Sequence, residues 1–476
     1  MFFKRIIFSI IILSNANYLI AQDSTNNYTL QQCVEIAIKN NPDVNAAHFQ
    51  QETNKVNVEQ AKGNALPFIS GYINHNNYNG RSINNYTNTY TDQNYFAAAY
   101  GLNASIVLWN GSSIQNYIKQ YALNEKAAEM DVQQQKDKLT LNIVLFYLSV
   151  LSNQEQLNLA EKQVAATQDK VKLLEIKNNE GAIAPSDLYD LKGQLAADQL
   201  SVTSTKNALE NAKLSLVQLM NIPYSNKIQL AKIDEKILPE SYGATVDEIY
   251  NNAAATLALV KASDLRKQSS AKAITAAKGQ LMPTLSLAGG FYTNYSSTAS
   301  TMQLINTSDV VSTNYVLINN IKTPVYTPQN IYQSNNIGYG SQWKNNFNSA
   351  IGLNLNIPIL NGLQARSKVK IAKINKEQAD FNAQTIKIQL RQAIEQDYVN
   401  MSTSFATYKT LFEQVQAYSQ SFRAAEIRFD AGAIATLDYL IVKNNIDRAN
   451  INFTAAKYDY IFRTKILDFY LGRPLW

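Results

Sequence analysis

Few residues of this 476-residue chain are of the types that perform chemistry. It has one cysteine, Cys33, and two histidines, His48 and His75, which are far apart in the sequence, so neither a disulfide framework nor a cluster of metal ligands is expected. Acidic residues such as Glu155 and Glu161 fall on predicted helical faces without a histidine or a nucleophile beside them. Nothing resembles a nucleotide-binding loop. We therefore expect no enzyme, no metal site and no cofactor.

The most informative acidic residues are Asp187 and Asp438. Each follows a turn of closely similar sequence, EIKNNEGAIAPSD at 175–187 and EIRFDAGAIATLD at 426–438. A carboxylate in the first turn of a helix is favoured by the helix dipole, so a structural role alone accounts for both aspartates.

The turns also contain the signals that end one helix and begin another. Gly181 and Gly432 suit the left-handed backbone that commonly follows a helix. Ser186 and Thr436 are of types that cap the next helix, and we expect them to do so. Each turn should therefore join two antiparallel helices.

The two turns belong to an internal repeat. AKGNALP at 61–67 matches AKGQLMP at 277–283, at an offset of 216 residues. GLNASIVLWNG at 101–111 matches GLNLNIPILNG at 352–362 at an offset of 251, which is also the offset between the turns. The change of offset indicates one insertion of 35 residues. A repeat of this kind indicates the overall architecture, so we interpret it before any local feature.

Both repeats should contain the same elements in the same order. A capping box, Thr29-x-x-Gln32 or Thr245-x-x-Glu248, begins a first helix, which Pro42 is expected to kink in the first repeat. Two strands follow, and then 69 residues without glycine or proline that predict a single helix about 100 Å long. The expected ranges are strands at about 67–80, 95–109, 283–295 and 346–360, long helices at 112–180 and 363–431, and last helices at 186–221 and 436–471.

The chain begins with the pattern of a secretory signal peptide. Lys4 and Arg5 precede the apolar run Ile6–Leu13, and Ala21 is a small residue suited to cleavage. We expect an exported protein with a signal peptide at 1–21, a first repeat at 22–223, a linker at 224–244 and a second repeat at 245–476. The net charge of +6, or +4 after removal of Lys4 and Arg5, is too small to favour nucleic acid as a partner.

The predicted strands alternate between apolar and polar residues. Even positions from Phe96 to Leu108, and odd positions from Phe347 to Ile359, are mostly apolar. Strands of about 10 residues with one apolar face are typical of a transmembrane barrel in an exported chain, and the alternative is a pair of amphipathic hairpins on a soluble core. Four strands cannot close a barrel, so a barrel would have to be shared between chains. Helices of about 100 Å would then project beyond a hydrocarbon core of about 30 Å, forming a conduit.

These features together resemble the TolC-type outer-membrane efflux channels. The resemblance rests on the opening YTLQQCVEIAIKNNPDV at 28–44, the repeated AKG…LP boundary, the strand endings LWNG and ILNG, and the two Gly-Ala-Ile-Ala turns. It implies a mainly α-helical homotrimer with a 12-stranded β-barrel in the outer-membrane lipid and a 12-helix tube extending through the periplasm. It also implies a periplasmic adaptor protein and an inner-membrane transporter as partners, with this chain as the passive exit duct.

The resemblance further implies roles for the two turns at the tip of the tube. It assigns Asp438, together with Asp187, to the pore constriction. Related channels often carry another acid three residues later, but Ile441 occupies that position here, so we expect at most one ring of three Asp438 carboxylates, which would concentrate cations. The residues implied to contact the adaptor are Gly181, Ala182, Ile183, Ala184, Pro185, Ser186, Gly432, Ala433, Ile434 and Ala435.

Two questions stay open at this point. The insertion, roughly 296–345, is interpreted either as an external cap over the exit or as a poorly ordered loop with no specific role. The linker should lie at the waist of the tube. Because the sequence ends at Trp476, we expect no belt around the tube formed by a C-terminal extension. A cell-surface scaffold or adhesin, whose helices form a closed bundle without a lumen, is the competing function.

Overall fold

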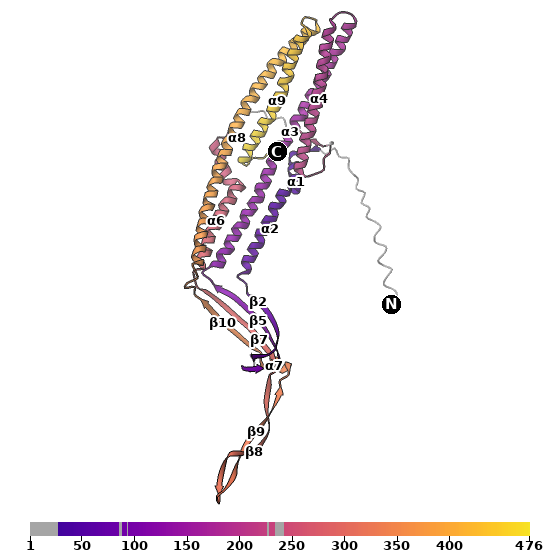
Figure 1. Cartoon of the computed structure of the whole chain (residues 1–476). Coiled ribbons are helices and arrows are strands. Elements are labelled where there is room, and N and C mark those ends of the chain that lie inside the picture. Colours follow the sequence, from indigo (N-terminus) through magenta and orange to yellow (C-terminus); the bar gives the residue numbers. More distant parts are fainter. Residues whose placement is uncertain (1–26, 85–87, 93, 226–227, 234–241) are drawn as a thin grey trace, which may run out of the picture. The chain divides into compact units, whose positions relative to one another are not determined.

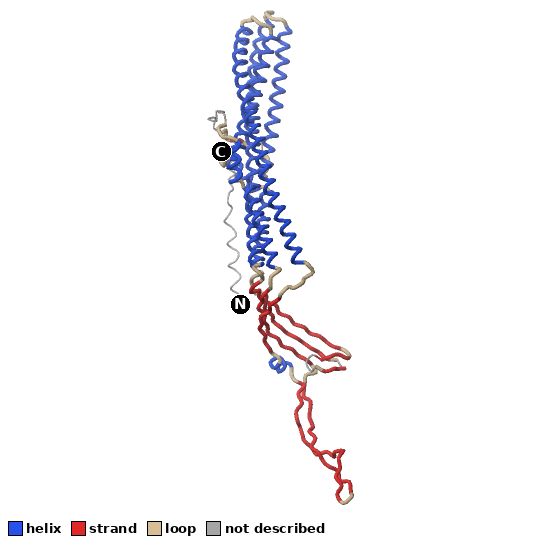
Figure 2. Tube along the Cα trace, turned by 90° about the vertical axis from the view of Figure 1, so that its left-hand side faces the viewer, coloured by secondary structure: helices blue, strands red, loops and turns tan. Residues whose placement is uncertain are grey.

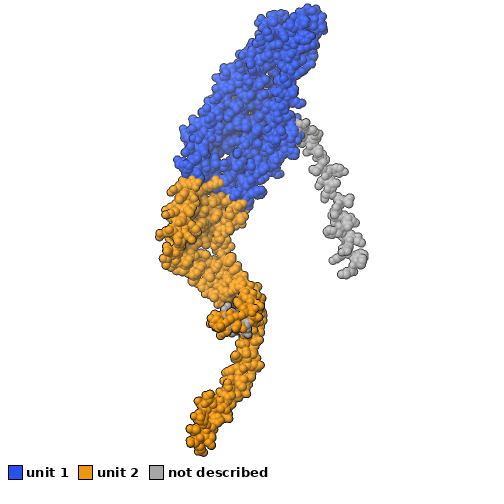
Figure 3. Space-filling view, in the orientation of Figure 1, with its two compact units in different colours: residues 1–52, 126–264, 381–476 blue, residues 53–125, 265–380 orange. Residues whose placement is uncertain are grey.

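The structure is a computed structural model that describes residues 27–84, 88–92, 94–225, 228–233 and 242–476. It is mostly helical and divides into two compact units, coloured separately in Figure 3. Unit 1 comprises Met1–Glu52, Lys126–Asp264 and Phe381–Trp476, and unit 2 comprises Thr53–Glu125 and Leu265–Asp380. The predicted signal peptide and part of the predicted linker lie outside the described residues.

Long helices make up most of the chain (Figure 1). Both segments without glycine and proline form single helices of 67 residues, α3 and α8, as their sequences predict. Apolar residues at three- and four-residue spacing give these helices buried seams, such as that of Leu139, Ile143 and Val150 on α3. The main helices are α1 (Leu30–Asn40), α2 (Pro42–Gly63), α3 (Ser113–Asn179), α4 (Pro185–Met220), α5 (Val246–Thr256), α6 (Ala258–Gly279), α8 (Gln364–Asp430) and α9 (Thr436–Tyr470).

The two predicted capping boxes are both formed. Thr29 accepts a hydrogen bond from the Gln32 backbone, and the Gln32 side chain accepts one from the Thr29 N–H. Thr245 and Glu248 make the same reciprocal pair at the start of α5. These side chains satisfy backbone donors that a helix start leaves unpaired.

The first helix of each half is broken, not only kinked. Asn41 separates α1 from α2, and its side chain accepts hydrogen bonds from the backbone N–H groups of Asp43 and Val44. Leu257, with an extended backbone, separates α5 from α6 without any proline nearby. Its side chain packs against a buried cluster of unit 1. We therefore attribute this break to tertiary packing, since no local sequence signal predicts it.

Four strands form one antiparallel sheet within unit 2, in the order β10-β7-β5-β2. The strands are labelled in Figure 1 and coloured red in Figure 2. Their bounds are β2 (Phe68–Tyr78), β5 (Tyr95–Trp109), β7 (Thr284–Ser296) and β10 (Asn348–Asn356). The last strand ends four residues before the predicted limit of 360, because Pro358 has no N–H to continue a ladder. Short pairs add β1 (Asn27–Tyr28) with β6 (Gln229–Leu230) and β3 (Arg81–Asn84) with β4 (Thr89–Asp92).

The insertion is ordered into secondary structure, which corrects its interpretation as a poorly ordered loop. β8 (Ser300–Ile318) and β9 (Ile321–Asn336) pair as a long antiparallel hairpin, followed by the short helix α7 (Tyr339–Asn345). Asn319 and Asn320 both have positive φ, 49° and 61°, as a two-residue hairpin turn requires. Whether the hairpin caps an exit stays a prediction.

The core of unit 1 consists of three buried clusters between helices. Cys33, fully buried on α1, belongs to the largest of them, and burial raises the pKa of its thiol to about 12. The cysteine is therefore a small core residue, as expected.

Among the described residues, no helix combines the length and apolar character needed to cross a membrane. The same residues include no group of three or more potential metal ligands.

Candidate conduit wall and tip

One face of the four-stranded sheet is mostly apolar. Lateral pairing places Leu102 beside Phe291, Ile106 beside Leu287, and Leu287 beside Leu353. Because paired residues of neighbouring strands point to the same side, these side chains form one surface. Large apolar residues of this face are exposed in the single chain, among them Ile69, Ile73, Ile351, Leu353 and Leu355. The alternation predicted for residues 96–108 and 347–359 is confirmed where these segments form strands.

The opposite face of the sheet is rich in amides and hydroxyls. Asn74 pairs through Ala99 with Asn294, and Asn354 pairs with Ser286. The Tyr292 hydroxyl donates to Asn103 Oδ1 at 2.7 Å across two strands of this face. A sheet with one apolar and one polar face can separate lipid from water.

Both edges of this sheet are open within the chain. β10 pairs only with β7, and β2 pairs only with β5, among the described residues. Unpaired edge strands of 9 and 11 residues carry rows of backbone donors and acceptors. In a membrane such groups must be paired, so a sheet of this kind needs strands from other chains to close it.

In unit 1, the two predicted turns join α3 to α4 and α8 to α9 (Figure 1). Gly181 and Gly432 have φ of +70° and +74°. Ala182 N–H donates to Lys177 O at 2.8 Å, and Ala433 N–H donates to Arg428 O at 2.7 Å. Both turns thus close their helices with the same glycine motif, as predicted.

The predicted caps of the next helices are wrong. The N-cap positions are Ala184 and Ala435, and neither makes a side-chain hydrogen bond to the helix. Ser186 is the second residue of α4, which begins one residue before the predicted start, and Thr436 is the first residue of α9, which begins at the predicted position. Pro185 at the first helical position explains the earlier start of α4, since its fixed φ suits a helix and it has no N–H to be capped.

A buried cluster lies behind the two turns. Ile183 and Ile434 pack against it, one from each turn. The rings of Phe429 and Tyr439 are stacked at 4.4 Å, and Tyr439 is fully buried, which raises the pKa of its hydroxyl. The cluster joins both helical hairpins through Val171, Leu174, Leu188, Leu191, Phe429, Tyr439 and Leu440.

The two predicted constriction residues occupy equivalent positions. Asp187 lies in the first turn of α4 and Asp438 in the first turn of α9. Asp438 is exposed, whereas Asp187 is half-buried. Ile441, one turn after Asp438, is also exposed, so an apolar side chain occupies the position where a second acid was considered. A single chain cannot bring three such carboxylates together.

A buried ionic network below the turns was not predicted. Lys443 Nζ on α9 lies 3.0 Å from Asp198 Oδ2 on α4 and 2.6 Å from Asp447 Oδ2. Thr167 on α3 donates to Asp198 at 2.5 Å, and Gln194 donates to it at 2.7 Å. Burial raises the pKa of Asp447 despite the neighbouring lysine. Lys443 and Asp447 have the i, i+4 spacing of a helical ion pair, but nothing in the sequence indicates Asp198 as a partner 245 positions away.

Partly exposed ion pairs join the same hairpins nearer the turns. Lys170 on α3 contacts Asp430 on α8 at 2.7 Å and Glu426 at 3.4 Å. Lys177 Nζ donates to the Asp430 backbone oxygen at 3.4 Å. These side chains are partly exposed, so each pair is expected to contribute no more than about 1 kcal/mol.

The sequence matches the model of a family described as "Outer membrane efflux protein" over residues 33–221 and 249–473. It is 23% identical over 395 residues to the outer membrane protein TolC of Salmonella enteritidis, covering 80% of this chain and 72% of that protein. The fold is similar to the VceC outer membrane protein of Vibrio cholerae, with a TM-score of 0.71, 13% identity and coverage of 94% and 97% of the two chains. It is also similar to the CmeC outer membrane channel of Campylobacter jejuni, with a TM-score of 0.70, 20% identity and coverage of 93% and 85%.

Proposed function

Because the chain belongs to the outer membrane efflux protein family, we propose that it is the passive exit duct of a tripartite exporter. As a member of this family, the chain is an outer-membrane efflux channel and not an enzyme. The finer proposal is that three copies close a 12-stranded barrel in the outer membrane and a 12-helix tube in the periplasm. Each half of the chain would supply one structural repeat, in line with the two segments that the family model matches.

The observation that carries this proposal is the four-stranded sheet of unit 2. Its apolar face, its amide-rich face and its two open edges, β2 and β10, are what one third of a shared barrel requires. The apolar face would contact lipid, and the face with Asn74, Asn103 and Asn294 would line the lumen.

The turns at Gly181 and Gly432 are the proposed site of adaptor contact. Both turns expose small residues, Ala182, Ala184, Ala433 and Ala435, which allow close approach of another backbone. An inner-membrane transporter would supply the energy. Asp438, exposed in the first turn of α9, would form a ring of three carboxylates in the trimer and favour cations at the constriction.

The competing function is a scaffold or adhesin with a closed helical bundle. Such a protein would not need a sheet that presents one apolar face and leaves both edges unpaired. The observed sheet therefore favours the channel.

Single-channel conductance in a planar bilayer tests the proposal, with wild type compared to Asp438→Ala. We expect a small cation-selective conductance that loses selectivity in the variant. Glu161→Ala, on α3, is the matched control and should leave selectivity unchanged. Equal selectivity in wild type and Asp438→Ala would place the constriction elsewhere, and folded, inserted wild type without conductance would favour the scaffold.

A further inference from the structure

The hairpin of β8 and β9 has two faces of different character over the half nearer its base. Because paired residues of neighbouring strands point to the same side, the register places Met302, Leu304 and Val311 of β8 on one face with Tyr326 and Tyr332 of β9. These five side chains are between 49% and 70% exposed in the single chain, and we call their surface the apolar ribbon face. The other face of this half is mostly polar and consists of Thr301, Gln303, Asn306, Ser308, Val310, Thr327, Gln329, Ile331, Gln333 and Asn335.

The turn end of the hairpin is apolar on both faces. Tyr315 and Leu317 continue the apolar ribbon face, and Ile318 and Ile321 flank the turn on the other face. Each of these four side chains is more than half exposed. A ribbon of two strands is at best marginally stable by itself in water, and a contiguous exposed apolar surface indicates an interaction site. We therefore expect the hairpin to pack against a partner.

The charge of the hairpin limits what that partner can be. From Ser296 to Ile337 the chain contains one acidic residue, Asp309, and one basic residue, Lys322. A surface that is apolar and nearly neutral offers little to a strongly charged partner, whereas two copies of it do not repel one another.

The edges of the hairpin are poorly suited to pairing with a further strand. Pro324 and Pro328 lie on β9, and a proline in a paired strand has its missing N–H on the side of the free edge. On β8 the register shifts twice, after Leu304 and after Val311, so that edge is interrupted as well. A partner should therefore contact the apolar ribbon face and not an edge.

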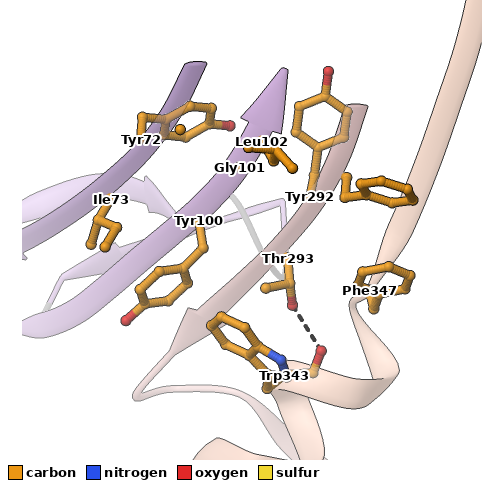
Figure 4. A pocket seen from close by; sticks show the side chains of 11 residues that line it. Tyr72, Ile73, Tyr100, Gly101, Leu102, Tyr292, Thr293, Trp343 and Phe347 are labelled. Carbon is orange, nitrogen blue, oxygen red and sulfur yellow. Dashed lines mark hydrogen bonds between the residues drawn. The ribbon is translucent and has the colours of Figure 1, made fainter. Parts of the chain in front are cut away.

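Hydrogen bonds hold the base of the hairpin to the four-stranded sheet. Gln342 on α7, 1% exposed, donates through Nε2 to Ser296 O at 2.9 Å and to Ile337 O at 2.7 Å. Thr293 Oγ1 on β7 donates to Trp343 O of α7 at 2.9 Å (Figure 4). The hairpin thus begins at a fixed point between β7 and β10, and β10 has the open edge at which another copy would join.

We propose that the β8–β9 hairpins of neighbouring copies pack against one another through the apolar ribbon face, outside the membrane. The inference rests on the proposed function, because a trimer with a shared barrel brings three identical hairpins to the same end of that barrel. The contact would continue the proposed interface at β10, and the fixed base lowers the entropy lost on packing. A second copy is the partner that presents the same neutral, apolar face at the same distance from the sheet. Cargo would then leave between the three hairpin bases.

Two adjacent valines test which face is packed. Val311 lies on the apolar ribbon face, paired with Tyr326, and Val310 lies on the other face, paired with Thr327. The one native cysteine, Cys33, is fully buried and should not react. Val311→Cys and its matched control Val310→Cys are purified as full chains in detergent and treated with a short bismaleimide, and covalent dimers are followed on denaturing gels.

We expect Val311→Cys to form covalent dimers at least about tenfold faster than Val310→Cys, at a rate independent of protein concentration, because the partner thiol lies within the same trimer. Equal rates, or no dimer from Val311→Cys, would overturn the proposal. Light scattering of the same samples separates the two failures. A trimer without face-selective cross-linking leaves the proposed channel intact, whereas a monomer removes the shared barrel as well.

Proteolysis gives a second readout that needs no cross-link. Thermolysin cleaves before large apolar residues, so an unpacked apolar ribbon face offers it many sites. We expect wild type and Val310→Asp to resist cleavage within the hairpin, and Val311→Asp to be cut at least about tenfold faster, because a carboxylate between packed faces would lose its hydration. Equal cleavage of the two variants would contradict the proposal.

Discussion

Lys443 Nζ lies 3.0 Å from Asp198 Oδ2, and the side chains of these residues are 3% and 7% exposed. The pair joins α9 to α4, and Thr167 extends it to α3. Charges withdrawn from water this far are tolerated only when they are paired and hydrogen-bonded, and both conditions are met here. The network therefore fixes the register between the two helical hairpins beneath the turns.

Lys443→Met should lower the free energy of unfolding by about 3 kcal/mol, because it leaves the Asp198 carboxylate buried without its cation. The double variant Lys443→Met/Asp198→Leu should recover part of this loss, since it removes the uncompensated charge as well. Guanidinium unfolding in detergent, followed by circular dichroism, measures both effects.

Lys192→Met is the control for this prediction. Lys192 pairs with Glu175 at 2.8 Å, but these side chains are 43% and 45% exposed. Removal of an exposed pair should cost less than about 1 kcal/mol. Equal losses for Lys443→Met and Lys192→Met would show that burial of the network contributes nothing.

Gly432→Ala tests the backbone of the second turn. Nothing lies within 4 Å of a Cβ built on Gly432, so its φ of +74° is the sole source of cost, about 1–2 kcal/mol. Gly193→Ala, in the interior of α4 and equally free of contacts, should instead stabilise the protein by up to about 1 kcal/mol. Opposite signs of the two changes in unfolding free energy are expected, and a neutral Gly432→Ala would mean that the turn is not held in the left-handed conformation.

Features that depend on residues close together in the sequence were predicted well. Features that depend on packing between distant residues were not. The capping box at Thr29 and the uninterrupted stretch of α3 depend on residues close in the chain, so their structures follow from spacing alone. The break at Leu257 and the pairing of Lys443 with Asp198 depend on packing between distant segments. At the candidate tip, the turns and the two aspartates were found because their sequence is repeated.

Asp397 provides a test of pH dependence. It accepts a hydrogen bond from the Tyr470 hydroxyl at 3.2 Å, yet burial raises its pKa above the usual 3.8 by more than that bond lowers it. The folded protein therefore holds this proton at pH values where the unfolded chain has lost it. Stability should fall as pH rises from about 3.8 through the raised pKa, and not the reverse.

Asp397→Asn should remove this contribution, because the amide does not titrate and still accepts from Tyr470. We expect the variant to be more stable than wild type at neutral pH and its unfolding free energy to vary less with pH just above 3.8. Denaturant unfolding at a series of pH values measures both. A variant with the pH dependence of wild type would assign the effect to other carboxylates.

The hairpin of β8 and β9 is expected to be dispensable for conduction. Its strands pair only with each other among the described residues, and Ser300 pairs with Asn336 at its base, where Ile337 N–H also donates to Ala299 O at 2.9 Å. Replacing 301–335 by an Asn-Gly turn preserves this base and suits a two-residue hairpin. The shortened protein should insert and conduct as wild type does in a planar bilayer, because the four-stranded sheet and α7 keep all their contacts. Loss of insertion would instead give the hairpin a role in assembly, and a larger conductance would support a cap over the exit.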